Sequence, residues 1–393
     1  MKKNKRMLCI LMMMLTAVLL FAGCSNKTQE TDEGVSVPET GVTEEAPEVS
    51  EEEEAEAEKA EAPTEGVTVM EATDKVVVSE DVIAEEQKPE ETEKKGDFLR
   101  AENGKILVDV VMFMGQSNMS GCGGDAAQAP VVNERAGYEF RAISDPTKLY
   151  PITEPFGINE NQIGGIIEYP GGKKGSLVSS FVNSYYEETG VPVIAVSASA
   201  GATTSEYWTR TAIVNDFAER HERAVVWLES NECSVRNQYV VWLQGESDAD
   251  AGITAQQYSE NMDNIIRPLF IKGVQKVFII RPGRTLDDEH FFDDIIQAQT
   301  EMCKDSSYYA LASTLLAGFD TSYMVDQWHY CQTALNLLGE DAGKNVAYYT
   351  NNKKEACMYD YKYHNTYIPD HFDYPADMEA EPILIEPMIK VNQ

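Results

Sequence analysis

Three residues of the chain could together carry out nucleophilic acyl transfer: Ser117, His329 and Asp326. A serine hydroxyl is a weak nucleophile near neutral pH, so it needs a base to accept its proton, and that base needs a carboxylate to orient it. The chain has only five histidines, and His329 follows Asp326 by three residues, just before a predicted helix. This spacing lets Asp326 reach the ring nitrogen that does not face the serine. We therefore predict a Ser117, His329, Asp326 triad.

Acyl transfer also needs hydrogen-bond donors directed at the oxygen that becomes negative in the transition state. The candidates are the backbone N–H groups of Ser117 and Gly201 and the side-chain amide of Gln244. Structural alternatives exist for each: Ser117 could cap a turn or helix, Gly201 could be a turn glycine, and Gln244 a satisfied core amide. Asp326 with His329 could likewise be a helix cap beside a surface histidine. We favour the catalytic interpretation because Ser117, Gly201 and Gln244 each follow a predicted strand. Asp326 and His329 then supply the base and its orienting carboxylate.

The segments around these residues alternate between apolar runs and amphipathic stretches. Apolar runs of the kind found in strands buried on both faces occupy 106–114, 191–196, 239–243 and 277–280. Stretches with helical spacing of apolar residues occupy 177–188, 215–229, 254–270 and 291–303. This alternation predicts an α/β fold, in which helices cover both faces of a central, mostly parallel sheet as a three-layer α/β/α arrangement.

The motif residues directly follow three of the predicted strands. These motifs are Gly115-Gln116-Ser117-Asn118, Ser199-Ala200-Gly201 and Gln244-Gly245-Glu246. Open parallel sheets bind ligands at the carboxyl ends of their strands, so we expect the three motifs to meet at one edge of the sheet. The G-x-S-x-G elbow of α/β-hydrolases is absent, because Met119 stands two residues after Ser117.

Taken together, these residues resemble the SGNH hydrolases, and in particular the branch of sialate O-acetylesterases and related carbohydrate acetylesterases. The resemblance spans roughly residues 106–350 and rests on Met114-Gly115-Gln116-Ser117-Asn118-Met119-Ser120-Gly121, on Gly201-Ala202-Thr203-Thr204 with Trp208, on Trp242-Leu243-Gln244-Gly245-Glu246-Ser247-Asp248, and on Asp326 with His329. It implies a flavodoxin-like fold, hydrolysis of sugar acetyl esters through an acyl-enzyme on Ser117, and an oxyanion role for Gln244. It implies neither metal nor cofactor.

Three departures from that branch concern the pocket rather than the triad. Cys122 stands where an arginine often follows the first block, Ala202 where a second glycine is usual, and Gln327-Trp328 where a glycine and an aliphatic residue are common. The sugar and the acetyl position are therefore not predicted. Aromatic residues near the motifs could stack on sugar rings or serve as core anchors: Trp208, Trp328 and Tyr330.

The first 97 residues have the features of a secretion signal followed by a tether. Basic residues within 2–6 precede an apolar run over 7–22, shorter than the roughly 20 residues of a membrane span, and the run ends in a sequence resembling a bacterial lipobox at Cys24. We predict a signal peptide over 1–23 and lipidation of Cys24, with an ordinary secreted protein as the alternative. Residues 25–97 hold 25 acidic residues against six lysines and no aromatic residue, which predicts a disordered acidic linker over 24–97.

Charge and cysteine content narrow the class of partner. The net charge of −34 argues against a nucleic-acid partner, because phosphate binding needs clustered lysine and arginine. The five cysteines after Cys24 show no spacing typical of a disulfide framework or a zinc site. We expect an esterase domain over 98–350, an extension of unknown structure over 351–393, a lipid anchor in the bacterial membrane with the domain outside the cell, and an acetylated glycan as substrate.

Two other functions remain open on the sequence. A carbohydrate-binding surface lipoprotein could keep the fold without catalysis, although it would not need Ser117, Asp326 and His329 together. A lipase or thioesterase of the same fold would act on longer acyl chains, so the preferred acyl length separates it from an acetylesterase.

Overall fold

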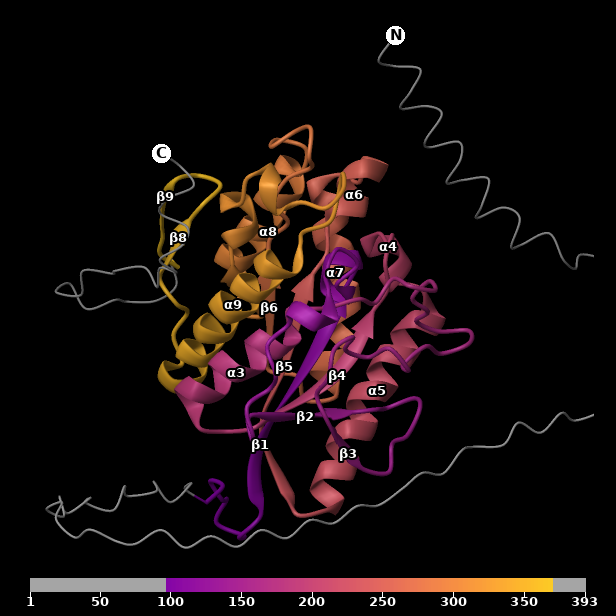
Figure 1. Cartoon of the computed structure of the whole chain (residues 1–393), viewed down its shortest axis with the longest axis vertical. Coiled ribbons are helices and arrows are strands. Elements are labelled where there is room, and N and C mark those ends of the chain that lie inside the picture. Colours follow the sequence, from indigo (N-terminus) through magenta and orange to yellow (C-terminus); the bar gives the residue numbers. More distant parts are fainter. Residues whose placement is uncertain (1–96, 370–393) are drawn as a thin grey trace, which may run out of the picture. The chain divides into compact units, whose positions relative to one another are not determined.

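The computed structural model describes residues 97–369. A seven-stranded sheet runs through it in the order β3-β2-β4-β1-β5-β6-β7, and all neighbouring strands are parallel except β2 and β3. Its strands are β1 (Ile106–Gly115), β2 (Gly137–Phe140), β3 (Leu149–Pro151), β4 (Val193–Ser199), β5 (Cys233–Leu243), β6 (Lys276–Ile280) and β7 (Tyr309–Ser313). The long apolar strand β1 therefore lies in the middle, and its carboxyl end points to the top of Figure 1.

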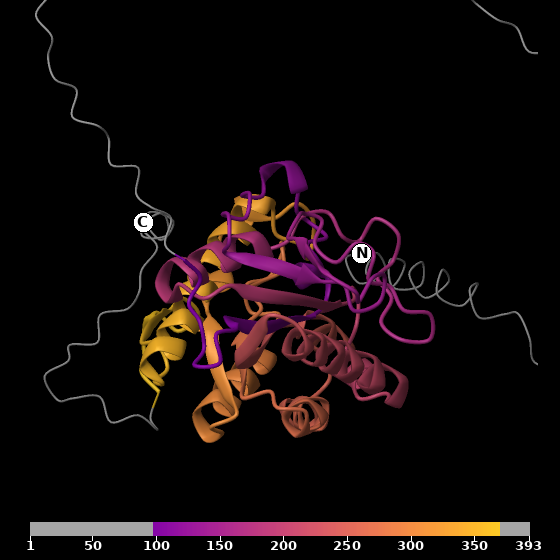
Figure 2. The same ribbon diagram turned by 90° about the horizontal axis from the view of Figure 1, so that it is seen from below.

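Helices cover both faces of this sheet, which gives the three layers seen end-on in Figure 2. The longer helices are α3 (Val178–Thr189), α5 (Thr211–Ser230), α7 (Ala255–Ile271), α8 (Asp293–Asp305) and α9 (Gln332–Asn352). Apolar residues of α3 and α9 pack on one face of the sheet, and those of α5, α7 and α8 pack on the other. Short turns of helix lie in the connections: α2 (Ser117–Ser120), α4 (Ser205–Trp208), α6 (Glu246–Ala251), η1 (Ala126–Gln128), η2 (Leu315–Gly318) and η3 (Thr321–Tyr323).

The predicted fold class is confirmed, and so are the four strands and four helices expected from the sequence. Side chains of β1 alternate between the two cores, with Val110 and Met112 in one and Val111 and Phe113 in the other, as expected of a strand buried on both faces. The sequence did not reveal β2, β3 and β7. Strands β2 and β3 are only four and three residues long, so their periodicity is too brief to recognise. Strand β7 is as long as β6, and its run Tyr309–Ser313 was overlooked.

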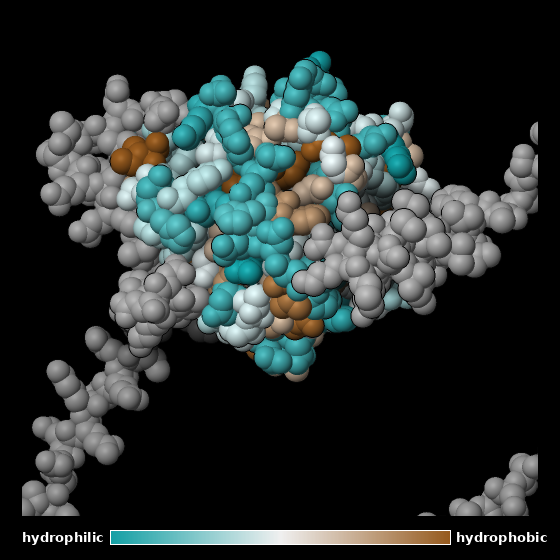
Figure 3. Space-filling model, turned by 90° about the horizontal axis from the view of Figure 1, so that it is seen from above, coloured by the Kyte–Doolittle hydropathy of each residue, from teal (hydrophilic) through white to brown (hydrophobic). Residues whose placement is uncertain are grey.

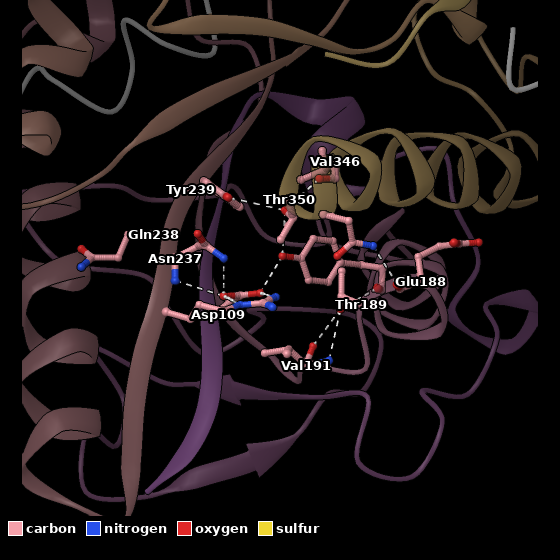
Figure 4. Close-up of polar contacts among 12 residues, drawn as sticks. Asp109, Glu188, Thr189, Val191, Asn237, Gln238, Tyr239, Val346 and Thr350 are labelled. Carbon is pink, nitrogen blue, oxygen red and sulfur yellow. Dashed lines mark hydrogen bonds and ion pairs between the residues drawn. The ribbon is translucent and has the colours of Figure 1, made fainter. Parts of the chain in front are cut away.

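A buried carboxylate fixes the register of β1 and β5 near their amino ends. The pairing of the two strands shifts between Val108 and Asp109, and the Asp109 carboxylate fills the irregularity. It accepts hydrogen bonds from the Asn237 backbone N–H at 3.0 Å and side-chain amide at 2.9 Å, from Arg236 Nε at 3.0 Å and from the Tyr185 hydroxyl at 2.6 Å. Figure 4 shows the Asp109–Asn237 bonds beside Thr350 of helix α9.

The described part of the predicted C-terminal extension is integrated into the folded domain. After α9 the chain forms a small antiparallel pair, β8 (Met358–Asp360) and β9 (Asn365–Tyr367). Two buried ion pairs join this segment to the sheet. Glu355 pairs with Lys276 of β6 at 2.9 Å, and Asp360 pairs with Arg281, the residue after β6, at 2.6 Å. Without residues 355 and 360, Lys276 and Arg281 would be buried charges without a carboxylate. The folded domain therefore continues beyond residue 350.

The predicted signal peptide over 1–23, the lipidation of Cys24, the acidic linker up to residue 96 and the end of the extension lie outside the described residues. Among the helices within 97–369, none combines the length and the apolar character that crossing a bilayer requires.

Candidate active site

Ser117 lies at a sharp turn between the end of β1 and helix α2. Gly115 adopts φ +140°, and a Cβ at this position would stand 2.0 Å from the carbonyl oxygen of Leu243, so only glycine fits beside the neighbouring strand. The backbone N–H of Gln116 donates to the same Leu243 oxygen at 3.0 Å. Ser117 is the first residue of α2, where N–H groups have no helical partner. The turn thus holds the Ser117 N–H and hydroxyl at the carboxyl edge of the sheet.

Asp326 and His329 form the pair predicted from their spacing. Asp326 Oδ2 lies 2.8 Å from His329 Nδ1, while its other oxygen accepts the backbone N–H groups of Trp328 at 2.8 Å and His329 at 2.9 Å. Burial alone would raise the pKa of Asp326, but the hydrogen bonds from His329 and Trp328 outweigh it and lower the pKa. An ionised carboxylate therefore faces Nδ1, which leaves Nε2 of His329 available to a reacting group.

Asn118, the residue after the predicted nucleophile, joins the serine turn to the histidine loop. Its side-chain N–H donates to the Trp328 carbonyl oxygen at 3.1 Å, and its carbonyl oxygen accepts the Tyr330 N–H at 3.3 Å. Asn118 therefore binds the residues on both sides of His329. No hydrogen bond links Ser117 Oγ directly to His329 in the described chain, but this bridge brings the two loops side by side, as expected of a serine and its base.

Glu246 completes this bridge from the third motif. Its Oε1 accepts the Asn118 amide at 2.7 Å, whereas Oε2 is buried without a hydrogen-bond partner among the described residues. Burial raises the pKa of Glu246. The hydrogen bond from Asn118 and the proximity of His329 oppose this shift but do not cancel it. Sequence reasoning did not assign Asn118 or Glu246 a role, although both lie within the quoted motifs.

Gln244 does not occupy the position predicted for an oxyanion donor. The side chain is fully buried, and both N–H groups of its amide are bound, one to the Thr203 carbonyl oxygen at 2.9 Å and one to Asp248. Because Asp248 also holds the Ser205 N–H and hydroxyl, this network connects the second and third motifs. Both N–H groups of the Gln244 amide are thus occupied, whereas its Oε1 is buried without a hydrogen-bond partner among the described residues.

Gly201 lies next to the serine turn, as expected, but its N–H is already bound. Glu168 Oε2 accepts the Gly201 N–H at 2.9 Å and also accepts the Ser120 hydroxyl. Glu168 comes from the long loop between β3 and α3, and it is 3 % exposed. Glu168 could not be predicted from the sequence, because the loop has no periodicity and no motif.

Of the three aromatic residues near the motifs, only Trp328 is partly exposed. Trp208 and Tyr330 are 0 % and 1 % exposed and serve as core anchors, while Trp328 packs on Phe291 and Phe292. Figure 3 views the face at the carboxyl ends of the strands, where apolar patches lie among hydrophilic residues. Two half-exposed residues beside the site contribute apolar surface: Tyr169 and Val325.

Cysteines and metal-ligating groups add no further site to the described domain. No disulfide joins any of the five cysteines within residues 97–369. Cys122, where an arginine is common in the resembling branch, accepts a hydrogen bond from the Tyr169 hydroxyl at 3.1 Å. Burial raises the pKa of this thiol to about 12, so it stays protonated and unreactive at neutral pH. No group of three or more potential metal ligands occurs in the same range.

Solved structures with some similarity include a protein from Arabidopsis thaliana, with 20 % identity, a TM-score of 0.46, and coverage of 62 % of this chain and 98 % of that one. A carbohydrate acetylesterase from Xanthomonas citri shows 17 % identity and a TM-score of 0.41, with 64 % and 58 % of the two chains covered. Another, from Sinorhizobium meliloti, shows 12 % identity and a TM-score of 0.29, with 62 % and 98 % covered. No curated protein matches the chain.

A family model covers more than half of the chain. It matches residues 107–347, which include all four sequence blocks and end within helix α9. The family is described as carbohydrate esterase, sialic acid-specific acetylesterase, and the resemblance expected from the sequence blocks is thereby confirmed. The described geometry, with Ser117 beside an oriented Asp326–His329 pair, suits ester hydrolysis. The chain is therefore a carboxylic ester hydrolase that belongs to the sialic acid-specific acetylesterase family of carbohydrate esterases.

Proposed function

We propose that the chain removes acetyl groups from acetylated carbohydrate outside the cell, through an acyl-enzyme on Ser117. The observation that carries this proposal is the Asn118 bridge, which fixes the Asp326–His329 pair beside the serine turn. A binding protein without catalysis would have no need for a histidine whose Nδ1 is held by a carboxylate.

In the first half-reaction, Ser117 Oγ attacks the acetyl carbonyl carbon while His329 Nε2 accepts the hydroxyl proton. The carbonyl oxygen becomes negative and is stabilised by the N–H groups of Ser117 and Gly201. The bond to the sugar oxygen then breaks, and His329 returns the proton to that oxygen, which releases the deacetylated sugar. Asp326 stays ionised and stabilises the imidazolium that forms in between.

In the second half-reaction, water replaces the sugar. His329 Nε2 accepts a proton from water, whose oxygen attacks the acyl-enzyme, and the bond between the acyl carbon and Ser117 Oγ breaks with return of the proton to Ser117. Acetate leaves. The expected lipid anchor at Cys24 and the acidic linker would hold this domain at the outer face of the bacterial membrane, near glycan substrates.

Restricted access to Ser117 favours a short acyl group. Ser117 is 5 % exposed, and Glu168 and Tyr169 close over Gly201, since a Cβ on that glycine would stand 2.7 Å from the Tyr169 ring and 3.0 Å from Glu168. An acetyl group needs little room, whereas a long acyl chain needs an apolar channel. We therefore favour an acetylesterase over a lipase or thioesterase.

The test compares nitrophenyl acetate, butyrate and octanoate as substrates for the full chain and for Ser117→Ala. Ser306→Ala, at the carboxyl end of helix α8, is the matched control. We expect preference for acetate and a loss of about 10³-fold or more in Ser117→Ala alone. Equal inactivity of all three proteins would instead support a carbohydrate-binding lipoprotein, and preference for octanoate would support a lipase.

A further inference from the structure

The carboxylate of Glu168 accepts the Gly201 N–H, which is one of the two oxyanion donors in the proposed reaction. The Gly201 N–H donates to Glu168 Oε2 at 2.9 Å, and the Ser120 hydroxyl donates to the same oxygen. In the proposed reaction this N–H would instead bind the acyl oxygen. A carboxylate and an oxyanion carry the same charge and prefer the same donor, so the two cannot use the Gly201 N–H together.

Neighbouring residues hold Glu168 firmly in this position. Asn161 binds its backbone on both sides, donating to the carbonyl oxygen at 3.1 Å and accepting the N–H at 2.9 Å. Gly172 packs against the carboxylate so closely that a Cβ there would stand 2.5 Å from Oε1. The loop between β3 and α3 is thus built around the Glu168 side chain.

A relay of hydroxyl groups connects Glu168 to a buried lysine. Lys173 Nζ donates to Ser199 Oγ at 2.8 Å, Ser199 and Ser120 hydroxyls lie 2.9 Å apart, and Ser120 donates to Glu168. Because each hydroxyl has one proton, the relay runs in one direction from ammonium to carboxylate. No lysine or arginine of the described chain forms an ion pair with Glu168 itself, so only neutral donors hold its charge at Gly201.

We propose that Glu168 keeps the esterase site in a closed state, by occupying the Gly201 N–H until substrate displaces it. This inference rests on the proposed function, because it takes the Gly201 N–H as an oxyanion donor. Displacement from Gly201 breaks the two neutral hydrogen bonds at Oε2 rather than an ion pair, while Oε1 accepts the Tyr169 N–H at 3.1 Å. The relay leaves the positive charge of Lys173 nearby to stabilise the released carboxylate. Glu168 therefore acts indirectly: in the closed state it keeps the Gly201 N–H from binding the acyl oxygen.

Glu168→Gln tests this directly, because it keeps the shape of the side chain and removes its charge. Glu160→Gln is the matched control: Glu160 lies in the same loop, is equally buried, and caps the N–H groups of Ile143 and Ser144. We expect Glu168→Gln to raise kcat/KM for a nitrophenyl acetyl ester about tenfold, since a neutral acceptor competes less well for the N–H, whereas the control changes it by less than about twofold.

Acetate binding gives a second readout that needs no turnover. Titration of the full chain with acetate should show affinity about tenfold higher in Glu168→Gln than in wild type, because the acetate carboxylate takes the vacated donor. If wild type hydrolyses no ester, the proposed function fails, yet this arm still reports on the Gly201 N–H. Unchanged or lower kcat/KM and acetate affinity in a folded Glu168→Gln would overturn the closed state and leave Glu168 as a structural brace.

Glu168→Asp keeps the proposal testable if the amide variant does not fold. The shorter side chain keeps its charge but withdraws the carboxylate from Gly201 by one methylene group. We expect acetate affinity to rise by about threefold, less than in the amide variant because the like charge stays close. A folded Glu168→Asp with wild-type acetate affinity would contradict the closed state.

Discussion

The two ends of strand β1 hold their buried carboxylates in different ways. At the amino end, Asp109 pairs with the cationic Arg236 and with amide and hydroxyl groups from β5 and α3 (Figure 4). At the carboxyl end, Glu168 is held by the backbone N–H groups of Gly201 and Tyr169 and by the Ser120 hydroxyl, and one oxygen of Glu246 has no partner in the described chain. Removing one partner of a buried ion pair destabilises a fold, whereas a carboxylate held by neutral donors can be displaced by a substrate.

This comparison predicts that carboxylates at the carboxyl end govern activity and that Asp109 governs stability. The largest effect is expected at Asp326. Asp326→Ala removes the group that orients His329, so kcat/KM should fall by about 10³-fold or more. Its side chain is 52 % exposed, so the melting temperature should stay within about 2 °C of wild type. Ester hydrolysis and a thermal melt measure both quantities, and near-normal turnover would remove Asp326 from the triad.

Asp109→Ala should show the opposite behaviour. Arg236 and Asn237 would lose their buried partner, and the free energy of unfolding should fall by about 3 kcal/mol, while kcat at 25 °C stays within about twofold. Urea denaturation followed by fluorescence measures the change in stability. Asp250→Asn, an exposed carboxylate on α6, serves as the control with little effect. A loss of kcat in folded Asp109→Ala would show that the two ends of β1 are coupled.

The pH dependence of stability should also differ between buried groups. Burial lowers the pKa of His221 to about 4, below the unfolded value of 6.5. As the pH falls, His221 therefore gains a proton in the unfolded chain before it does so in the folded chain. The stability that comes from neutral, buried His221 is fully present above pH 6.5, and the free energy of unfolding falls by about 3 kcal/mol as the pH drops from 6.5 to 4. His221→Phe should flatten that part of the curve in urea denaturation at several pH values.

Asp341 provides a control of opposite sign for that measurement. Its burial raises the pKa of the carboxyl from 3.8 to about 7, so the folded chain holds the proton longer, and stability falls as the pH rises from 3.8 to 7. Asp341→Asn should remove this loss. If the stability curves of both variants run parallel to the wild-type curve, neither group titrates as its burial implies.

The smallest effect is expected for Tyr169→Phe. The Tyr169 hydroxyl donates to Cys122 Sγ at 3.1 Å, a weak bond in which sulfur is a poor acceptor. Its loss should change KM for a nitrophenyl acetyl ester by about twofold and leave kcat unchanged. A change in KM of about tenfold or more would show that the Tyr169 hydroxyl contacts the substrate rather than only the thiol.

Local pattern was sufficient for the architecture and for the pairing of Asp326 with His329. The long apolar runs of β1 and β5 and the helical spacing in α7 are visible in the sequence because each spans many residues. The strands β2 and β3 were missed because three or four residues are too few to show a periodicity. Gln244 was assigned to the oxyanion site from its motif, but Asp248, four residues later, binds its amide. Glu168 has no local signal at all.

The sequence by itself determined the parallel sheet, the glycine turn before Ser117 and the three-residue spacing of Asp326 and His329, because these depend on steric and hydrophobic rules that act over a few residues. Tertiary structure decided which histidine loop lies beside the serine turn. His290 also follows an aspartate, Asp287, by three residues, yet its side chain is 69 % exposed. Asn118 binds the loop of His329, and contacts across 210 residues of chain follow from packing, which local pattern does not contain.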